Sequence, residues 1–196
     1  RRGLELYRDG DFPRGVGDTL GNIGGVHLLL GQFREALGYY QQALVISERL
    51  ESKASMSQDH GNLGLCLLGL GDVDAALAHL DQAIELATET GMRQDQAYWL
   101  RVKGDGLVER GQYPLGLLNH RAALAIYERI GAQAELLEAL HDFGELHLLL
   151  GDSASAERDF KRALGVARSI GLDRGITMNL ISLGDVEFRR KRPDAA

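Results

Sequence analysis

The sequence is short of residues on which several classes of protein depend. Its 196 residues include one cysteine, Cys66, so neither an internal disulfide nor a cysteine metal cluster can form. A chain with a single cysteine fits a reducing compartment, and we expect a cytoplasmic protein. No apolar run approaches the roughly 18 residues of a membrane-spanning helix, so we expect no membrane partner. The N-terminus lacks a signal-peptide pattern and an initiator methionine, and we expect a piece of a longer chain.

Positive charge is also in deficit. Lys and Arg number 22 against 28 Asp and Glu, which gives a net charge of −6. Proteins that bind nucleic acid mainly by neutralising phosphates carry the opposite balance, so we expect no nucleic-acid partner. Phosphate-binding loops, zinc-protease motifs and the serine elbow of hydrolases are missing. We therefore expect no enzyme, no catalytic residue, no cofactor and no metal.

Glycine, in contrast, is abundant, and its positions repeat. The chain has 25 glycines, nearly twice the usual share of about 7%. Three columns recur every 40 residues: Gly31, Gly71, Gly111 and Gly151; Gly24, Gly64, Gly104, Gly144 and Gly184; and Ala43, Ala83, Ala123 and Ala163. A fixed period over nearly the whole chain is the signature of a repeat architecture. We expect a single array over residues 1–196, with full repeats at 16–55, 56–95, 96–135 and 136–175, the tail of a repeat at 1–15 and the start of a fifth at 176–196.

Each unit has the pattern of two helices. In the first unit, apolar residues at helical spacing end at Gly31, which we expect in the left-handed conformation that closes a helix. The second helix should begin near Phe33 and end at about Leu50. Pro114 falls in the first turn of its helix, where a missing N–H does little harm, and Pro13 and Pro193 fall in predicted turns. A glycine inside a helix, as at Gly24, costs roughly 1 kcal/mol against alanine, which indicates close helix approach.

These columns resemble the tetratricopeptide repeat. The matching residues are Leu20, Ile23, Gly24, His27, Ala36, Tyr40 and Ala43 in the first repeat, His60, Leu63, Gly64, Leu67, Ala76, Leu80 and Ala83 in the second, and Leu140, Phe143, Gly144, His147, Ala156, Phe160 and Ala163 in the fourth. The third repeat departs, with Lys103 and Gly116 at two of these positions. The 40-residue form is similar to repeats of kinesin light chains, spindle-orientation adaptors and bacterial regulators. The resemblance implies an all-α solenoid of tetratricopeptide type, a right-handed superhelix with a concave face.

The first helix of each repeat lines the inner surface of such solenoids. The residues of this helix that we expect at the inner surface are amides and small residues in the first repeats and acids in the later ones. Our candidate peptide-binding residues are Asn22, Asn62, Leu65, Arg101, Asp105, His141, Asp142, Glu145 and Asp185. Asparagine offers donors and acceptors to a peptide backbone, and the resemblance implies that role. The acids either steer a basic partner or form a solvated face.

The sequence leaves several interpretations open. The first is a protein-interaction scaffold or adaptor that holds a peptide with basic residues; the alternative is a peptide- or ligand-sensing domain of a larger bacterial regulator. A terminal repeat exposes an apolar face, so we expect self-association or instability. Cys66 lies in an apolar run and should be a buried, inert thiol. The basic run at 188–192 is either a localisation or anion-binding signal or a helix end, where cations are favoured.

Overall fold

The computed structural model describes residues 13–191, and all the regular structure in this range is α-helical, as predicted. In chain order the helices are α2 (Pro13–Leu29), α3 (Phe33–Arg49), α4 (Lys53–Gly69), α5 (Val73–Glu89), α6 (Arg93–Glu109), α7 (Tyr113–Ile130), α8 (Gln133–Leu149), α9 (Ser153–Ser169) and α10 (Asp173–Lys191). The predicted start of the second helix near Phe33 is confirmed. Pro114 lies in the first turn of α7, as expected. Pro13, expected in a turn, is instead the first residue of α2, and Pro193 lies outside the described residues.

The turns explain the glycine column. Gly31, Gly71, Gly111 and Gly151 all have positive φ, between 69° and 79°, which confirms the left-handed conformation predicted for them. At the first turn, the Gln32 N–H donates to the His27 carbonyl and the Gly31 N–H donates to the Leu28 carbonyl, which satisfies two carbonyls at the helix end. The turns between repeats use the same device, at Gly91, Gly131 and Gly171, and at Glu51, which has a φ of 50°. A helix therefore begins every 20 residues.

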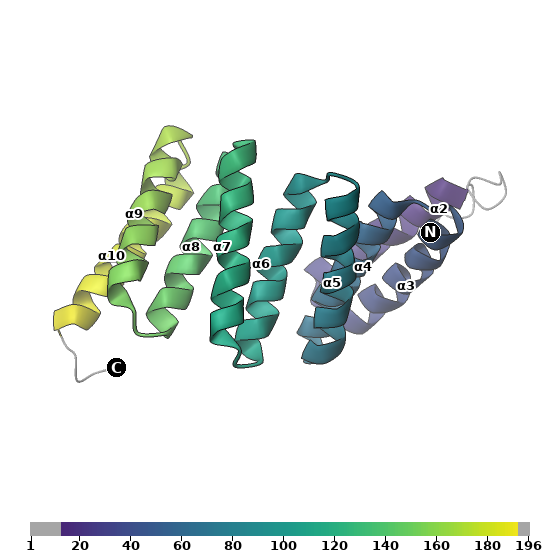
Figure 1. Ribbon diagram of the computed structural model, residues 1–196, viewed down its shortest axis with the longest axis horizontal. Coiled ribbons are helices and arrows are strands. Elements are labelled where there is room, and N and C mark those ends of the chain that lie inside the picture. The colour runs from purple at the N-terminus through teal and green to yellow at the C-terminus, as the bar shows by residue number, and fades with distance from the viewer. Residues whose placement is uncertain (1–12, 192–196) are drawn as a thin grey trace. The chain divides into compact units, whose positions relative to one another are not determined.

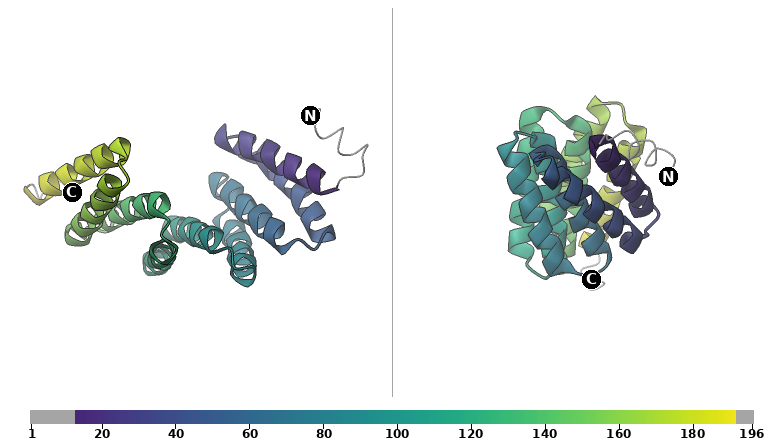
Figure 2. Two further views of the ribbon diagram at one scale, coloured as in Figure 1. Left: turned by 90° about the horizontal axis from the view of Figure 1, so that it is seen from above. Right: turned by 90° about the vertical axis from the view of Figure 1, so that its right-hand side faces the viewer.

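The chain forms two compact units, residues 1–116 and 117–196, and α7 contributes to both. Within each unit, helices that follow one another in the sequence pack side by side (Figure 1). In the first unit, α2, α4 and α6 form one layer, and α3 and α5 form the other (Figure 2). The layers hold small clusters of buried side chains, such as Ala36, Tyr40, Leu63 and Cys66. Cys66 is fully buried, as predicted, and burial raises the pKa of its thiol to about 11.

Glycines inside the helices allow the helices of a pair to approach closely. Three glycines of the second column each face a large side chain on the following helix. The pairs are Gly24 with Tyr40, Gly64 with Leu80, and Gly144 with Phe160. A Cβ atom at Gly144 would lie 2.6 Å from the Phe160 ring, which is too close for a real contact. The close helix approach predicted from this column is therefore present in both units.

The positions of the repeat boundaries stay a prediction. The helices α4, α6, α8 and α10 begin at residues 53, 93, 133 and 173, three residues before our divisions. Residues 13–15, which we assigned to a preceding repeat, belong to α2, and residues 1–12 and 192–196 lie outside the described part. Self-association also stays a prediction. Leu180, Ile181 and Phe188 on α10 are exposed apolar side chains on which it could rest.

Candidate functional site

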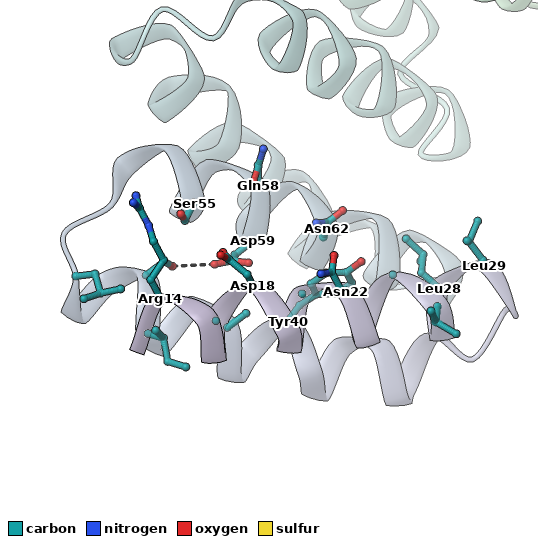
Figure 3. Close-up of a pocket in the computed structure, with 18 residues that line it drawn as sticks. Arg14, Asp18, Asn22, Leu28, Leu29, Tyr40, Ser55, Gln58, Asp59 and Asn62 are labelled. Atoms are coloured by element: carbon teal, nitrogen blue, oxygen red, sulfur yellow. Dashed lines mark hydrogen bonds between the residues drawn. The ribbon is translucent and has the colours of Figure 1, made fainter. Parts of the chain in front are cut away.

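A pocket of about 680 Å³ opens between α2 and α4, which belong to one layer of the first unit (Figure 3). One wall comes from α2 and the other from α4, and the floor comes from residues of α3 such as Tyr40 and Ala43. Glycines on α2 leave space above the floor. A Cβ at Gly21 would meet no described atom within 4 Å, and one at Gly25 would approach the Tyr40 hydroxyl at 3.5 Å. Glycine in these columns thus creates open volume as well as close packing.

Two predicted site residues stand on the walls of this pocket. Asn22 projects from α2 and Asn62 from α4, and both line it (Figure 3). Asn22 is exposed and Asn62 is half-buried, so their amide groups are accessible. The structure therefore brings these two predicted residues to the same site.

Asp59 is a pocket residue that the sequence analysis missed. The residue is only 8% exposed, and its Oδ2 accepts a hydrogen bond of 2.8 Å from the Ser47 hydroxyl on α3. Burial raises the pKa of Asp59 to about 6, from an ordinary 3.8. The negative charge of Asp18 on α2 adds to this increase, and the bond from Ser47 opposes it. The pocket therefore holds a carboxyl group whose ionised form is destabilised by burial.

Tyr40 forms the floor beneath the two walls. Its ring lies against Gly24, and the residue is 3% exposed. Burial raises the pKa of Tyr40 to about 12, and the nearby Cys66 and Asp59 add to the effect. The hydroxyl consequently stays protonated at neutral pH and is a hydrogen-bond donor that faces the glycines of α2.

The remaining predicted residues of the first unit lie on α4 and α6. Leu65 is half-buried and packs against a core cluster that includes Leu80 and Trp99, so it contributes to the core. Arg101 places its guanidinium 5.3 Å from the centre of the Tyr98 ring, in a cation–π contact. Asp105 is half-buried on the same helix. None of these three lines the pocket.

The predicted residues of the second unit lie on α8 and α10, where neighbours engage most of them. His141 Nδ1 lies 3.2 Å from Asn179 Oδ1, and Glu145 accepts a hydrogen bond of 3.2 Å from the Ser182 hydroxyl. Asp185 forms an ion pair of 2.9 Å with Arg189. Asp142 is half-buried. These four form an acidic surface with one histidine, and their role in binding stays a prediction.

The sequence did hold a signal for Asp59. Its column in the 40-residue register is otherwise uncharged, with Thr19, Trp99, Ala139 and Asn179. His60 carries a similar signal, because its column is otherwise leucine, at Leu20, Leu100, Leu140 and Leu180. In the structure, the Nδ1 atoms of His60 and His79 lie 2.9 Å apart. Burial lowers the pKa of both histidines, and the charge of His79 lowers that of His60 further.

His27 and His147 share one column of the repeat, and both pack against neighbouring side chains. His147 is buried, with Nδ1 2.8 Å from Asp159 Oδ2, and His27 is half-buried and stacks on Tyr39. In the described part of the chain, no three side chains of His, Cys, Asp or Glu are placed to hold a metal ion. Between residues 13 and 191, no helix has the length and apolar character needed to cross a bilayer.

The basic run is part of a helix and is ion-paired. Residues 188–191 belong to α10, as the helix-end interpretation predicted. Arg189 pairs with Asp185 at 2.9 Å, Arg190 with Glu157 at 2.6 Å, and Lys191 with Glu187 at 4.0 Å. These pairs favour a structural role for the run, and Arg192 lies outside the described residues.

The fold is shared with several solved structures. Matches include BtubC (BKLC) from P. vanneervenii, with a TM-score of 0.81 and 18% identity over 94% of this chain and 79% of that one. Aspartyl phosphate phosphatase F from Bacillus subtilis matches with a TM-score of 0.79 and 16% identity, over 92% of this chain and 52% of that one. A putative kinesin light chain from Podospora anserina, with nearly identical TPR-like repeats, gives a TM-score of 0.67 and 13% identity, over 92% of this chain and 98% of that one.

The comparisons support the solenoid fold at low sequence identity. The chain spans about half the length of the Bacillus phosphatase. None of the curated proteins that were compared matches this sequence. The tetratricopeptide repeat model, in contrast, matches residues 15–89 and 95–169, which is well over half of the chain. The predicted resemblance is therefore confirmed, and the chain belongs to the tetratricopeptide repeat family.

Proposed function

We propose that this chain is a non-enzymatic scaffold that binds an extended peptide segment of a partner protein on its inner helices. The observation that carries the proposal is the pocket between α2 and α4. Its volume of about 680 Å³ lies within the range of about 300–1,000 Å³ that is typical of ligand sites. The tetratricopeptide repeat family supports a role in protein interaction.

The lining of the pocket suits a peptide. Asn22 and Asn62 each carry an amide that can donate to a backbone carbonyl and accept from a backbone N–H. Val26 and Leu29 also line the pocket, and they are 57% and 89% exposed. Apolar side chains so exposed next to hydrogen-bonding groups are typical of an interaction site. The amides would hold the backbone of the segment, and the apolar residues would contact its side chains.

The acids outside the pocket have a different part in this proposal. Asp105 on α6, Asp142 on α8 and Asp185 on α10 are half-buried, and Glu145 on α8 is exposed. Charges outside a binding site act mainly on the rate of encounter with a partner, and salt screens those that are exposed to solvent. A partner with basic residues would therefore associate more slowly at high ionic strength.

The experiment is a selection of peptides by the chain. A phage library that displays random heptapeptides is panned on the wild type and on the double variant Asn22→Ala, Asn62→Ala. The matched control is Gln41→Ala, Gln82→Ala, which removes two exposed amides of α3 and α5 that do not line the pocket. We expect enrichment on the wild type and on the control, and at least a tenfold weaker affinity of the selected peptides for the asparagine variant.

Two results would overturn the proposal. The first is a wild-type chain that enriches no peptide, although circular dichroism shows that it is folded. The second is an asparagine variant that binds the selected peptides as tightly as the wild type, because the pocket would then have no part in binding.

A second candidate is a sensing domain of a larger bacterial regulator. It is favoured by the fold match to a Rap protein, which was solved in complex with Competence and Sporulation Factor; the TM-score is 0.75 and the identity 19%, over 95% of this chain and 54% of that one. A sensor would change its dimensions when it binds a peptide, whereas a rigid scaffold would not. Small-angle scattering with and without a selected peptide separates the two, since an unchanged radius of gyration excludes the sensing mechanism.

A further inference from the structure

We propose that the acidic end of the pocket binds the cationic side chain of a lysine or arginine in the bound peptide. Asp59 and Asp18 would be the residues that recognise the positive charge. The inference rests on the proposed function, because it assigns chemistry to one position of the peptide that the pocket holds. It does not involve the acids of α6, α8 and α10.

Asp59 is placed to recognise a ligand. Only one of its carboxylate oxygens has a hydrogen-bond partner in the described part of the chain, namely Oδ2, which accepts from Ser47. The residue is more than nine-tenths buried and lines the pocket. A buried carboxylate ordinarily has an opposite charge or a full set of hydrogen bonds. Residues 13–191 supply neither to Asp59, so the pocket has room for a ligand that supplies them.

Asp18 strengthens the preference for a cation. It lines the same pocket from α2, and it makes no ion pair or hydrogen bond with any residue that the structure describes. Its charge acts on Asp59, since it raises the pKa of that carboxyl. Two carboxylates that line one pocket repel each other, and a cation bound between them would attract both. Arg14 lines the pocket as well but forms no ion pair with either acid within residues 13–191.

The walls next to the acids suit the rest of a long basic side chain. Ser47, which donates a hydrogen bond to Asp59, has Ile46 beside it on α3, and Leu50 directly follows the end of that helix; all three line the pocket. Lysine and arginine carry three or four methylenes below the charge, and these pack well on apolar surface. An acidic end beside an aliphatic wall therefore matches a basic side chain better than it matches a small inorganic cation.

The charged and titratable groups around Asp59 predict a dependence on pH. They are Arg14 and Asp18 from α2 and Tyr40 from α3, and Tyr40 stays neutral because burial keeps its pKa at about 12. Asp59 loses its charge as the pH falls through about 6. Affinity for a basic side chain should therefore weaken between pH 7.5 and pH 5.

The test uses a peptide selected by the wild-type chain and its synthetic copy in which the basic residue is replaced by norleucine. Affinities for both are measured by fluorescence polarisation with the wild type, with Asp18→Asn, Asp59→Asn, and with the control Glu35→Gln, Glu85→Gln. The control removes two exposed charges of α3 and α5 outside the pocket. Loss of one partner of a desolvated charge pair typically weakens binding about thirtyfold or more.

Each outcome bears on the inference. We expect the norleucine peptide to bind the wild type at least about thirtyfold more weakly, and the aspartate variant to bind both peptides equally. Selected peptides without a shared basic residue, or a basic preference that persists in the aspartate variant, would overturn this inference and leave peptide binding intact. A wild type that selects no peptide would overturn the proposed function as well.

Discussion

Asp59→Asn should make the protein more stable at neutral pH. The substitution keeps the shape of the side chain and leaves an oxygen to accept the hydrogen bond from Ser47. It removes a carboxylate that burial and Asp18 make costly to ionise. A site that binds a charged ligand at the expense of stability is a familiar trade-off. The variant should therefore gain stability while it loses affinity for a basic peptide.

The size of the effect follows from the pKa of Asp59. The folded value of about 6 lies above the ordinary 3.8, so the folded state binds more protons than the unfolded state between these pH values. The ionised carboxyl group therefore lowers the free energy of unfolding by its full amount above pH 6. This destabilisation decreases as the pH falls toward 3.8. Each pH unit is worth about 1.4 kcal/mol, so the penalty is about 3 kcal/mol at pH 7 and about 1 kcal/mol at pH 4.5.

The assay is urea unfolding at both pH values, followed by circular dichroism. The other groups with shifted pKa values, including Asp159, His60 and His79, are the same in both proteins, so their contributions cancel in the difference. We expect Asp59→Asn to be more stable than the wild type by up to about 3 kcal/mol at pH 7, with a smaller gain at pH 4.5. An equal gain at both pH values, or a loss at pH 7, would refute the electrostatic reasoning.

Three further predictions concern a glycine inside a helix, a turn and a pair of histidines. Gly144→Ala should destabilise the fold by about 1–3 kcal/mol, because the added methyl group would press on an aromatic ring of α9. Gly165→Ala, on the open surface of α9, should instead stabilise the fold by up to about 1 kcal/mol. Melting temperatures of the two variants that shift in the same direction would contradict this prediction. Glu51→Gly should raise stability by up to about 1 kcal/mol, since a non-glycine residue is strained at a φ of 50°, and an unchanged melting temperature would count against it. Burial lowers the pKa of His60 and His79, so the unfolded state binds more protons below about pH 6.5 and the wild type loses stability on acidification. His60→Leu should lose less stability than the wild type between pH 7 and pH 5. An equal loss would contradict a contribution of the two histidines to the pH dependence of stability.

The fold could be predicted because its signals are local and repeated. A residue with positive φ after a helix favours glycine, so Gly31 and its equivalents mark the turns directly in the sequence. The 20-residue spacing was harder to see because Glu51 interrupts the glycine column at the turns between repeats. Glycine inside a helix has no local advantage, so Gly24 correctly indicated close packing against another helix.

The site could be predicted only in part. Asn22 and Asn62 were found because they share a column on the inner helices, and they do line one pocket. Asp59 was missed because its importance comes from tertiary packing: Ser47 on the neighbouring helix holds it, and burial raises its pKa. Leu65 was assigned to the groove from its column, yet it packs against a core cluster. The position of a residue in the repeat predicts which side of its helix the side chain occupies, but the neighbouring helix determines whether that side is exposed to solvent or buried in the core.

The most direct test of peptide binding in this pocket is a chemical-shift map. The ¹⁵N-labelled chain is titrated with a peptide from the phage selection, and the backbone amide signals are followed. We expect the largest changes on the pocket walls, at Asn22 of α2 and at Asp59 and Asn62 of α4, with little change at exposed positions of α5 such as Gln82. Changes confined to the outer helices, with the signals of α2 and α4 unmoved at saturation, would contradict the claim that the inner face binds the peptide.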